Sequence, residues 1–125
     1  MKYILLTAVL LFCHYLADYT HLSRPYMLAA KRFGKPLWPI FIHACTHGTL
    51  MGCALLLFNV KTETTLWLVC MQVLSHFIID VLKGRINIWI PMVQQPAKVW
   101  HWVVFGADQY FHQVIILWMV LIALN

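Results

Sequence analysis

The stretch TTLWLVCMQVLSHFIIDVLK, residues 64–83, combines a long apolar run with two polar side chains near its end. About 20 apolar residues are enough for a helix to cross the hydrocarbon core of a bilayer. His76 and Asp80 are four residues apart, so such a helix places both on one face. An acid inside hydrocarbon costs at least about 2.5 kcal/mol on insertion scales. By itself, one such pair is as compatible with hydrogen bonding between helices as with a set of ligands, so the other helices decide its meaning.

The composition of the whole chain is typical of an integral membrane protein. Of its 125 residues, 62% are hydrophobic and 10% are charged, with a mean hydropathy of +0.76. Soluble domains average roughly 45–50% apolar and about 25% charged residues. The net charge of +5 does not indicate nucleic-acid binding, because the basic residues flank apolar stretches. In those places they orient helices and contact anionic lipid.

The apolar pattern predicts a single all-α domain over residues 1–125, a compact bundle of four membrane-spanning helices. The predicted helices cover about residues 2–19, 37–59, 64–83 and 98–124.

Two connections between these helices are longer than a turn. SRPYMLAAKRFGKP, residues 23–36, predicts a short interfacial helix in the first cytoplasmic loop, capped by Ser23 and ended by Gly34. We expect Lys31 and Arg32 to point from it toward lipid headgroups. GRINIWIPMVQQP, residues 84–96, is too short to span and is expected to lie along the interface or to re-enter the bilayer.

Basic residues are unevenly divided between the two ends of the predicted bundle. Lys2 and Lys61 lie at the end that carries both termini. The loops at the other end hold Arg24, Lys31, Arg32, Lys35, Lys83, Arg85 and Lys98. Because basic loops stay in the cytoplasm, this bias predicts a multi-pass protein of the cytoplasmic membrane with both termini outside the cytoplasm.

Each predicted span carries one pair of histidine or aspartate residues at a spacing of four. The pairs are His14 and Asp18, His43 and His47, His76 and Asp80, and Asp108 and His112. Because the helices alternate in direction, all four pairs fall in the cytoplasmic half of the membrane. We therefore expect the eight side chains to converge.

Imidazole and carboxylate groups mixed at this spacing are typical of metal ligands, because two ligands on one helix face bind an ion with preset geometry. Eight candidates exceed the four ligands of zinc. Either two divalent ions bind, or some members hydrogen-bond to the ligands and orient them. Zinc is favoured, and iron, manganese or copper also fit. Structural polar packing and a proton or ion pathway are the competing interpretations.

Further residues near the pairs suggest catalytic roles. Lys83 and Arg85 are expected at the cytoplasmic mouth of the site, where they could hold a phosphate group. Asp80 or Asp108, if not bound to the ion, could act as a general base.

The order HxxxD, HxxxH, HxxxDxxK, DQxxH resembles a family of small, uncharacterised bacterial and phage membrane proteins. It is also similar to the membrane-bound metal-dependent hydrolases. The matching residues are His14, Asp18, His43, His47, His76, Asp80, Lys83, Asp108, Gln109 and His112. Members often have Gln four residues after the first Asp, whereas this chain has Leu22 there. The resemblance implies a metal site more strongly than a particular reaction.

The leading hypothesis is metal-dependent hydrolysis of a phosphoester or pyrophosphoester in a membrane lipid at the cytoplasmic leaflet. A divalent-metal or proton transporter is one alternative, although the outer half of each helix is almost entirely apolar. Another is a non-catalytic, redox or haem-binding subunit of a larger membrane complex, although three carboxylates argue against haem. The expected partners are lipid and either a larger complex or further copies of the chain, and no nucleic acid.

Overall fold

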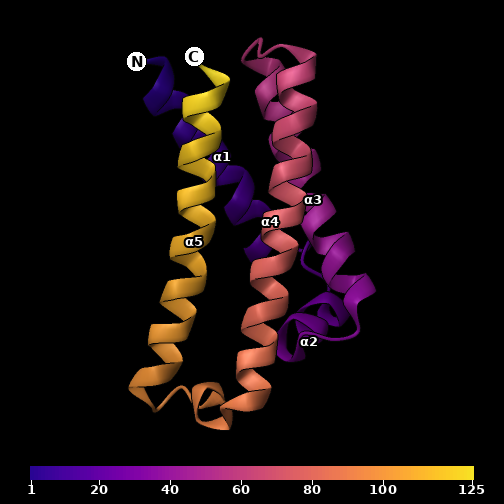
Figure 1. Ribbon diagram of the computed structural model, residues 1–125, viewed down its shortest axis with the longest axis vertical. Coiled ribbons are helices and arrows are strands. Elements are labelled where there is room, and N and C mark those ends of the chain that lie inside the picture. The colour runs from indigo at the N-terminus through magenta and orange to yellow at the C-terminus, as the bar shows by residue number, and fades with distance from the viewer.

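The computed structural model describes residues 1–125 and contains five α-helices, one short 3₁₀ helix and no strands. These are α1 (Lys2–Tyr19), α2 (Pro25–Phe33), α3 (Leu37–Leu57), α4 (Thr62–Trp89), η1 (Pro91–Gln94) and α5 (Val99–Ala123). Both termini lie at one end of the molecule, and α2 lies near the other end (Figure 1). The phenolic hydroxyl of Tyr3 donates to the carbonyl oxygen of Leu124 at 3.3 Å and so joins the two termini. The prediction of an all-α fold is confirmed.

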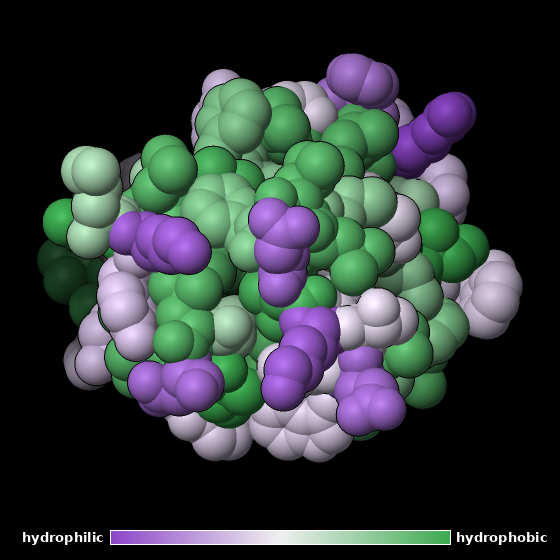
Figure 2. All heavy atoms as spheres, turned by 90° about the horizontal axis from the view of Figure 1, so that it is seen from above, coloured by the Kyte–Doolittle hydropathy of each residue, from purple (hydrophilic) through white to green (hydrophobic).

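Three helices, α3, α4 and α5, are long and apolar enough to cross a membrane. They indicate a membrane protein. The prediction of four spans is confirmed for these three only, since α1 is not among them. Large apolar side chains such as Trp67, Leu82 and Leu121 are each more than half exposed, as contact with lipid would require. Even the end that carries the termini shows mostly hydrophobic side chains, with separate hydrophilic ones among them (Figure 2).

An apolar core fills the half of the bundle nearer the termini. Its members come from α1, α3, α4 and α5 and include Leu6, Leu10, Met51, Leu55, Leu68, Ile116 and Met119. The most extensive helix interface lies between α3 and α4. There, Gly48 and Gly52 face the side chains of Val73 and Val69, and a Cβ atom at either glycine would lie within 2.8 Å of a valine methyl group. The small residues of α3 thus let α4 pack closely against it.

Helix α4 is longer than the sequence predicted. It continues past Lys83 to Trp89 and ends at Ile90, just before Pro91. Proline has no backbone N–H and disfavours a helical residue before it, so the helix stops there. The prediction of a separate interfacial or re-entrant segment is therefore wrong for residues 84–89, which extend the helix.

Helix α2 is fixed against α4 by two glycines. Gly34 ends α2 in the left-handed conformation at φ 60°, as predicted, whereas the hydroxyl of Ser23 makes no capping bond. A Cβ atom on Gly84 of α4 would lie 2.1 Å from the backbone nitrogen of Gly34. Only glycine permits this approach, which brings the last turn of α2 against α4.

Candidate metal centre

The structure brings all eight predicted histidine and aspartate side chains together inside the bundle. His43, His47, His76 and Asp80 are fully buried, and the other four side chains are at most about 6% exposed. The pairs come from α1, α3, α4 and α5, so each of these helices contributes one polar face. This convergence is what the spacing and depth of the pairs predicted.

The first group of possible metal ligands is built around Asp18. Its Oδ1 atom lies 2.9 Å from Nε2 of His43 and 3.4 Å from Nε2 of His47, and those two nitrogens are 3.2 Å apart. With His76, these residues offer four ligand atoms that all lie within 4.8 Å of one another. Two ligand atoms, each about 2.1 Å from a tetrahedral ion, are about 3.4 Å apart. The observed separations are close to this value.

The second group is built around Asp80. Its two oxygens lie 3.3 Å from Nε2 of His76 and 3.6 Å from Nε2 of His112. His76 belongs to both groups, so the two form one continuous site. If each group held an ion, the six residues would leave coordination positions for water or substrate.

Several buried polar atoms in this cluster make no hydrogen bond. They include both carboxylate oxygens of Asp80, both ring nitrogens of His76 and of His14, and Nε2 of His112. An unsatisfied buried polar atom costs about 1–3 kcal/mol, and more when it is charged. A cation among them would satisfy several at once. The buried histidine and aspartate groups could therefore hold a metal ion.

His14 and Asp108 lie beside the two groups without belonging to either. Nε2 of His14 is 3.3 Å from Oδ2 of Asp18, and Oδ1 of Asp108 is 3.5 Å from Nε2 of His112. Each thus contacts one possible ligand. This is the position of a residue that orients a ligand rather than one that must bind the ion.

Lys31 is the site residue that the sequence prediction missed. Its Nζ atom lies 2.9 Å from Oδ1 of Asp18, 3.3 Å from Oδ2 of Asp80 and 3.0 Å from Nε2 of His43. The expectation that Lys31 points to lipid headgroups is wrong, because the docking of α2 on α4 turns this side chain inward. Burial opposes its charge, but the carboxylates of Asp80 and Asp18 outweigh burial and raise the pKa of Lys31 above its ordinary value.

A weak signal for Lys31 was present in the sequence. Met27, Ala30 and Lys31 follow the i, i+3, i+4 spacing of one helix face, and the first two are buried. Arg32 projects elsewhere and is exposed, with its guanidinium donating to Oε1 of Gln94 at 3.2 Å. The periodicity of this short helix therefore separates the inward lysine from the outward arginine.

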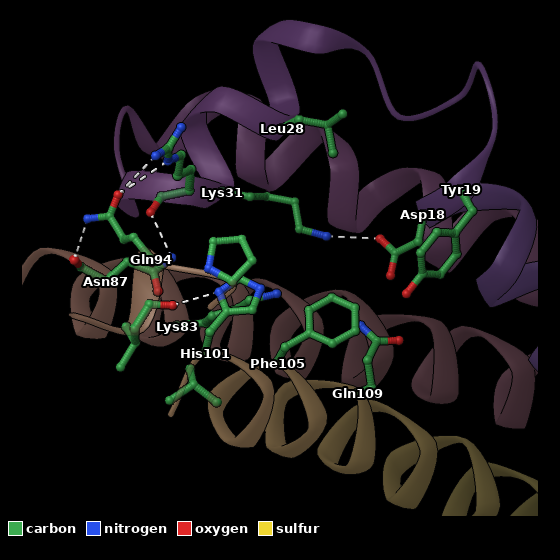
Figure 3. Close-up of a pocket in the computed structure, with 14 residues that line it drawn as sticks. Asp18, Tyr19, Leu28, Lys31, Lys83, Asn87, Gln94, His101, Phe105 and Gln109 are labelled. Atoms are coloured by element: carbon green, nitrogen blue, oxygen red, sulfur yellow. Dashed lines mark hydrogen bonds and ion pairs between the residues drawn. The ribbon is translucent and has the colours of Figure 1, made fainter. Parts of the chain in front are cut away.

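A cavity of about 540 Å³ leads from the cluster to the end of the molecule that holds the basic loops. Asp18, Lys31, Lys83 and Gln109 line it where it meets the cluster, and Gln94 and His101 line it farther out (Figure 3). Arg32 also lines it, next to Gln94. Nζ of Lys83 donates to Oδ2 of Asp108 at 2.7 Å. Lys83 thus lines the cavity beside the cluster. Arg85 does not line the cavity.

Comparison with known proteins relates the chain to one family. Residues 5–125 match the model of a family described as proteins of unknown function, DUF3307. The chain belongs to this family. No curated protein and no solved structure matches it. Membership agrees with the predicted resemblance to uncharacterised proteins, while the similarity to metal-dependent hydrolases stays a prediction.

The charges of the site in this DUF3307 protein favour a further cation. Asp18, Asp80 and Asp108 contribute three carboxylates, and only Lys31 and Lys83 pair with them as ammonium groups. If every imidazole is neutral, the buried cluster carries one uncompensated negative charge, which either a metal ion or a proton on His112, 3.5–3.6 Å from two carboxylates, would balance. Burying such a charge is unfavourable unless a cation accompanies it.

Proposed function

We propose that this protein is a metal-dependent integral membrane hydrolase that acts on a phosphoester or pyrophosphoester of a membrane lipid at the cytoplasmic leaflet. The observation that carries the proposal is Asp80. Its side chain is fully buried, imidazole nitrogens flank its two oxygens at 3.3 Å and 3.6 Å, and its one ammonium partner, Lys31 at 3.3 Å, is shared with Asp18. A divalent ion bound between this carboxylate and the imidazoles would compensate the buried negative charge. One or two ions, with zinc favoured, would bind the two groups described above.

The residues of the site fall into two sets, those that would bind the ions and those that would assist the reaction. Asp18, His43, His47, His76, Asp80 and His112 would hold the ions. A bound divalent ion supplies an activated water and stabilises charge that develops on a phosphoryl oxygen.

Asp108 fits the role of general base better than Asp80. It lies outside both ligand groups, and its Oδ1 atom makes no hydrogen bond and has only Nε2 of His112 beside it, at 3.5 Å. Its other oxygen accepts from Lys83, which lines the cavity and orients the carboxylate. Asp80 is assigned to the metal instead.

The position of the cavity supports a lipid substrate at the cytoplasmic leaflet. The cavity opens at the end of the bundle with the basic loops, which the positive-inside rule places in the cytoplasm. In this orientation both termini lie outside the cytoplasm. Apolar side chains such as Leu28, Val104 and Phe105 line part of the cavity and would contact the acyl or prenyl part of a substrate.

Transport is less well supported than hydrolysis. A transport pathway needs polar groups through the whole thickness of the membrane. Between the metal-ligand cluster and the termini, the interior is the apolar core that includes Leu10, Met51 and Met119. The buried polar side chains in this half are only Gln72 and Thr65, which are seven residues apart on α4, so polar groups are too sparse there for an ion route.

Metal analysis of the detergent-purified protein tests the proposal. We expect one or two divalent ions per chain in the wild type, and loss of most of the metal in Asp80→Asn and His76→Ala. His21→Ala is the matched control, because His21 is exposed, outside the helices and outside the cluster. Equal, near-zero metal in all four proteins would refute the metal centre.

Phosphate release separates an enzyme from a non-catalytic metal protein. The metal-loaded wild type is incubated with a phosphatidate and a polyprenyl diphosphate in mixed micelles, beside Asp108→Asn. We expect release by the wild type and a fall of at least about a hundredfold in Asp108→Asn, as for loss of a general base. Bound metal without release from either lipid would contradict the hydrolase and leave a metal-binding subunit.

A further inference from the structure

We infer that the cavity is a binding site for a phosphate group, which Lys31 and Lys83 bind once metal has been loaded. The inference rests on the proposed function and assigns the anion-binding residues of that site. It replaces the expected pair of Lys83 and Arg85 by a pair from two different helices.

The two lysines are placed to act together. They line the same cavity, Lys31 from α2 and Lys83 from α4 (Figure 3). Their side chains are 13% and 22% exposed, so each ammonium is largely removed from solvent but still borders the cavity. A charge-assisted contact made in such an environment is stronger than one on an open surface.

Without metal, both lysines are already paired. Lys31 contacts Asp18 and Asp80, and Lys83 contacts Asp108. The three carboxylates outnumber these two ammonium groups, so the inner end of the cavity has no unpaired ammonium to attract an anion. Arg32 is the remaining cation of the lining, and it lies farther out, where its guanidinium donates to Gln94.

A divalent ion reverses this balance. It contributes two positive charges, so one bound ion makes the cluster net positive and a second adds to it. Asp18 and Asp80 are the carboxylates of the two ligand groups, and they are the partners of Lys31. An ion that binds them frees Lys31 to contact an anion in the cavity. Because coupling between two sites is reciprocal, phosphate should also tighten metal binding.

The lining of the cavity defines the ligand class. Its volume of about 540 Å³ lies within the range of roughly 300–1,000 Å³ that is typical of small-molecule sites. Polar residues at the inner end and Leu28, Val93 and Phe105 along the walls suit a phosphate ester with an organic group. A lipid headgroup and a soluble phosphate ester share this chemistry.

Equilibrium dialysis with radiolabelled inorganic phosphate tests the inference on the purified full chain, with and without zinc. We expect phosphate to bind the zinc-loaded wild type and to bind the metal-free protein at least about tenfold more weakly. Lys31→Met and Lys83→Met should each weaken phosphate binding to the loaded protein about tenfold or more, as for loss of a charged hydrogen bond. Lys35→Met is the control, since Lys35 is exposed and outside the cavity.

Metal content, measured on every sample, separates this inference from the proposed function. Lys31→Met and Lys83→Met should retain zinc, which also shows that they are folded. Zinc uptake with no phosphate binding, or with binding unchanged in both variants, would overturn the phosphate site and leave the metal centre intact. Phosphate binding that is independent of zinc would also overturn it. Absence of zinc uptake would overturn both proposals.

Two further ligands identify the source of the phosphate. Glycerol 3-phosphate and a short-chain phosphatidate are used as competitors of the radiolabelled phosphate. Stronger competition by the phosphatidate supports the site and assigns it to a lipid headgroup. Equal competition supports the site and assigns it to a soluble ester, whereas no competition by either overturns it.

Discussion

The ammonium group of Lys31 lies 3.3 Å from the carboxylate of Asp80, although the two residues belong to different helices far apart in the sequence. The same ammonium lies 2.9 Å from the carboxylate of Asp18. It therefore contacts one carboxylate from each of the two groups that we propose as metal ligands. A cation of the protein itself thus stands where a metal ion would need to bind.

Replacement of Lys31 by methionine should increase the affinity for metal. The substitution removes a positive charge next to Asp18 and Asp80 and leaves an unbranched apolar side chain that is one atom shorter. Two like charges about 5 Å apart repel by about 3 kcal/mol at an effective dielectric constant near 20. We expect at least a fivefold lower dissociation constant for zinc, measured by competition with a chromophoric chelator.

The exposed Lys35 provides the matched control for this charge effect, because Lys35→Met removes the same charge from a loop residue with no contact to the cluster. Its zinc affinity should equal that of the wild type. An equal rise of the zinc affinity in both variants would indicate an effect of the protein's net charge. A lower zinc affinity of Lys31→Met would contradict competition between this lysine and the metal.

Removal of the metal should lower the thermal stability of the protein. A ligand that binds only the folded state stabilises it by about 2.7 kcal/mol when its concentration is a hundred times the dissociation constant. The melting temperature in detergent should therefore fall on treatment with a chelator and recover with added zinc. In Asp80→Asn the same treatment should produce little change, and an equal shift in that variant would place the stabilising ion elsewhere.

Replacement of Gly84 by alanine should loosen α2 from α4. The added Cβ atom would lie 2.1 Å from the backbone nitrogen of Gly34, so the backbone must move. Overpacking of this kind costs about 1–3 kcal/mol. We expect a lower melting temperature, together with easier proteolysis of the segment around α2.

Gly106 offers the control for this substitution within the same protein. A Cβ atom there would have nothing within 4 Å, although Gly106 also lies inside a helix. Because alanine favours a helix over glycine by about 1 kcal/mol, Gly106→Ala should keep or slightly raise the melting temperature. If the two variants behaved alike, the close contact of α2 with α4 would be refuted.

The proposed orientation in the membrane can be tested by labelling single cysteines. The four native cysteines, Cys13, Cys45, Cys53 and Cys70, are first replaced by alanine. An impermeant maleimide should label Lys61→Cys in intact spheroplasts, because this exposed residue lies beside residues of both termini, such as Tyr3 and Asn125. Lys35→Cys should react only after the membrane is opened. The reverse pattern would place the cavity on the outer side.

The residues of the metal-ligand cluster could be predicted because their pattern is local. His76 and Asp80 share a helix face because of their spacing alone. The lengths of the apolar segments predict helices that alternate in direction, and these place the other three pairs at the same depth in the bundle. For the same reason the helix boundaries were close to those observed, except that α4 runs on to Trp89. The predicted helix ended at Lys83, whereas in the structure Gly84 continues the helix and contacts Gly34.

The sequence by itself determined that the protein is helical, that it carries membrane-length apolar helices, and that four polar pairs meet in one half of the bundle. Only the tertiary structure decided that Lys31 joins them, that His76 is shared between two ligand groups, and that a cavity reaches the cluster past Lys83. The physical reason is that helical periodicity depends on residues a few positions apart. The inward turn of Lys31 depends instead on the approach of two glycine backbones from separate helices.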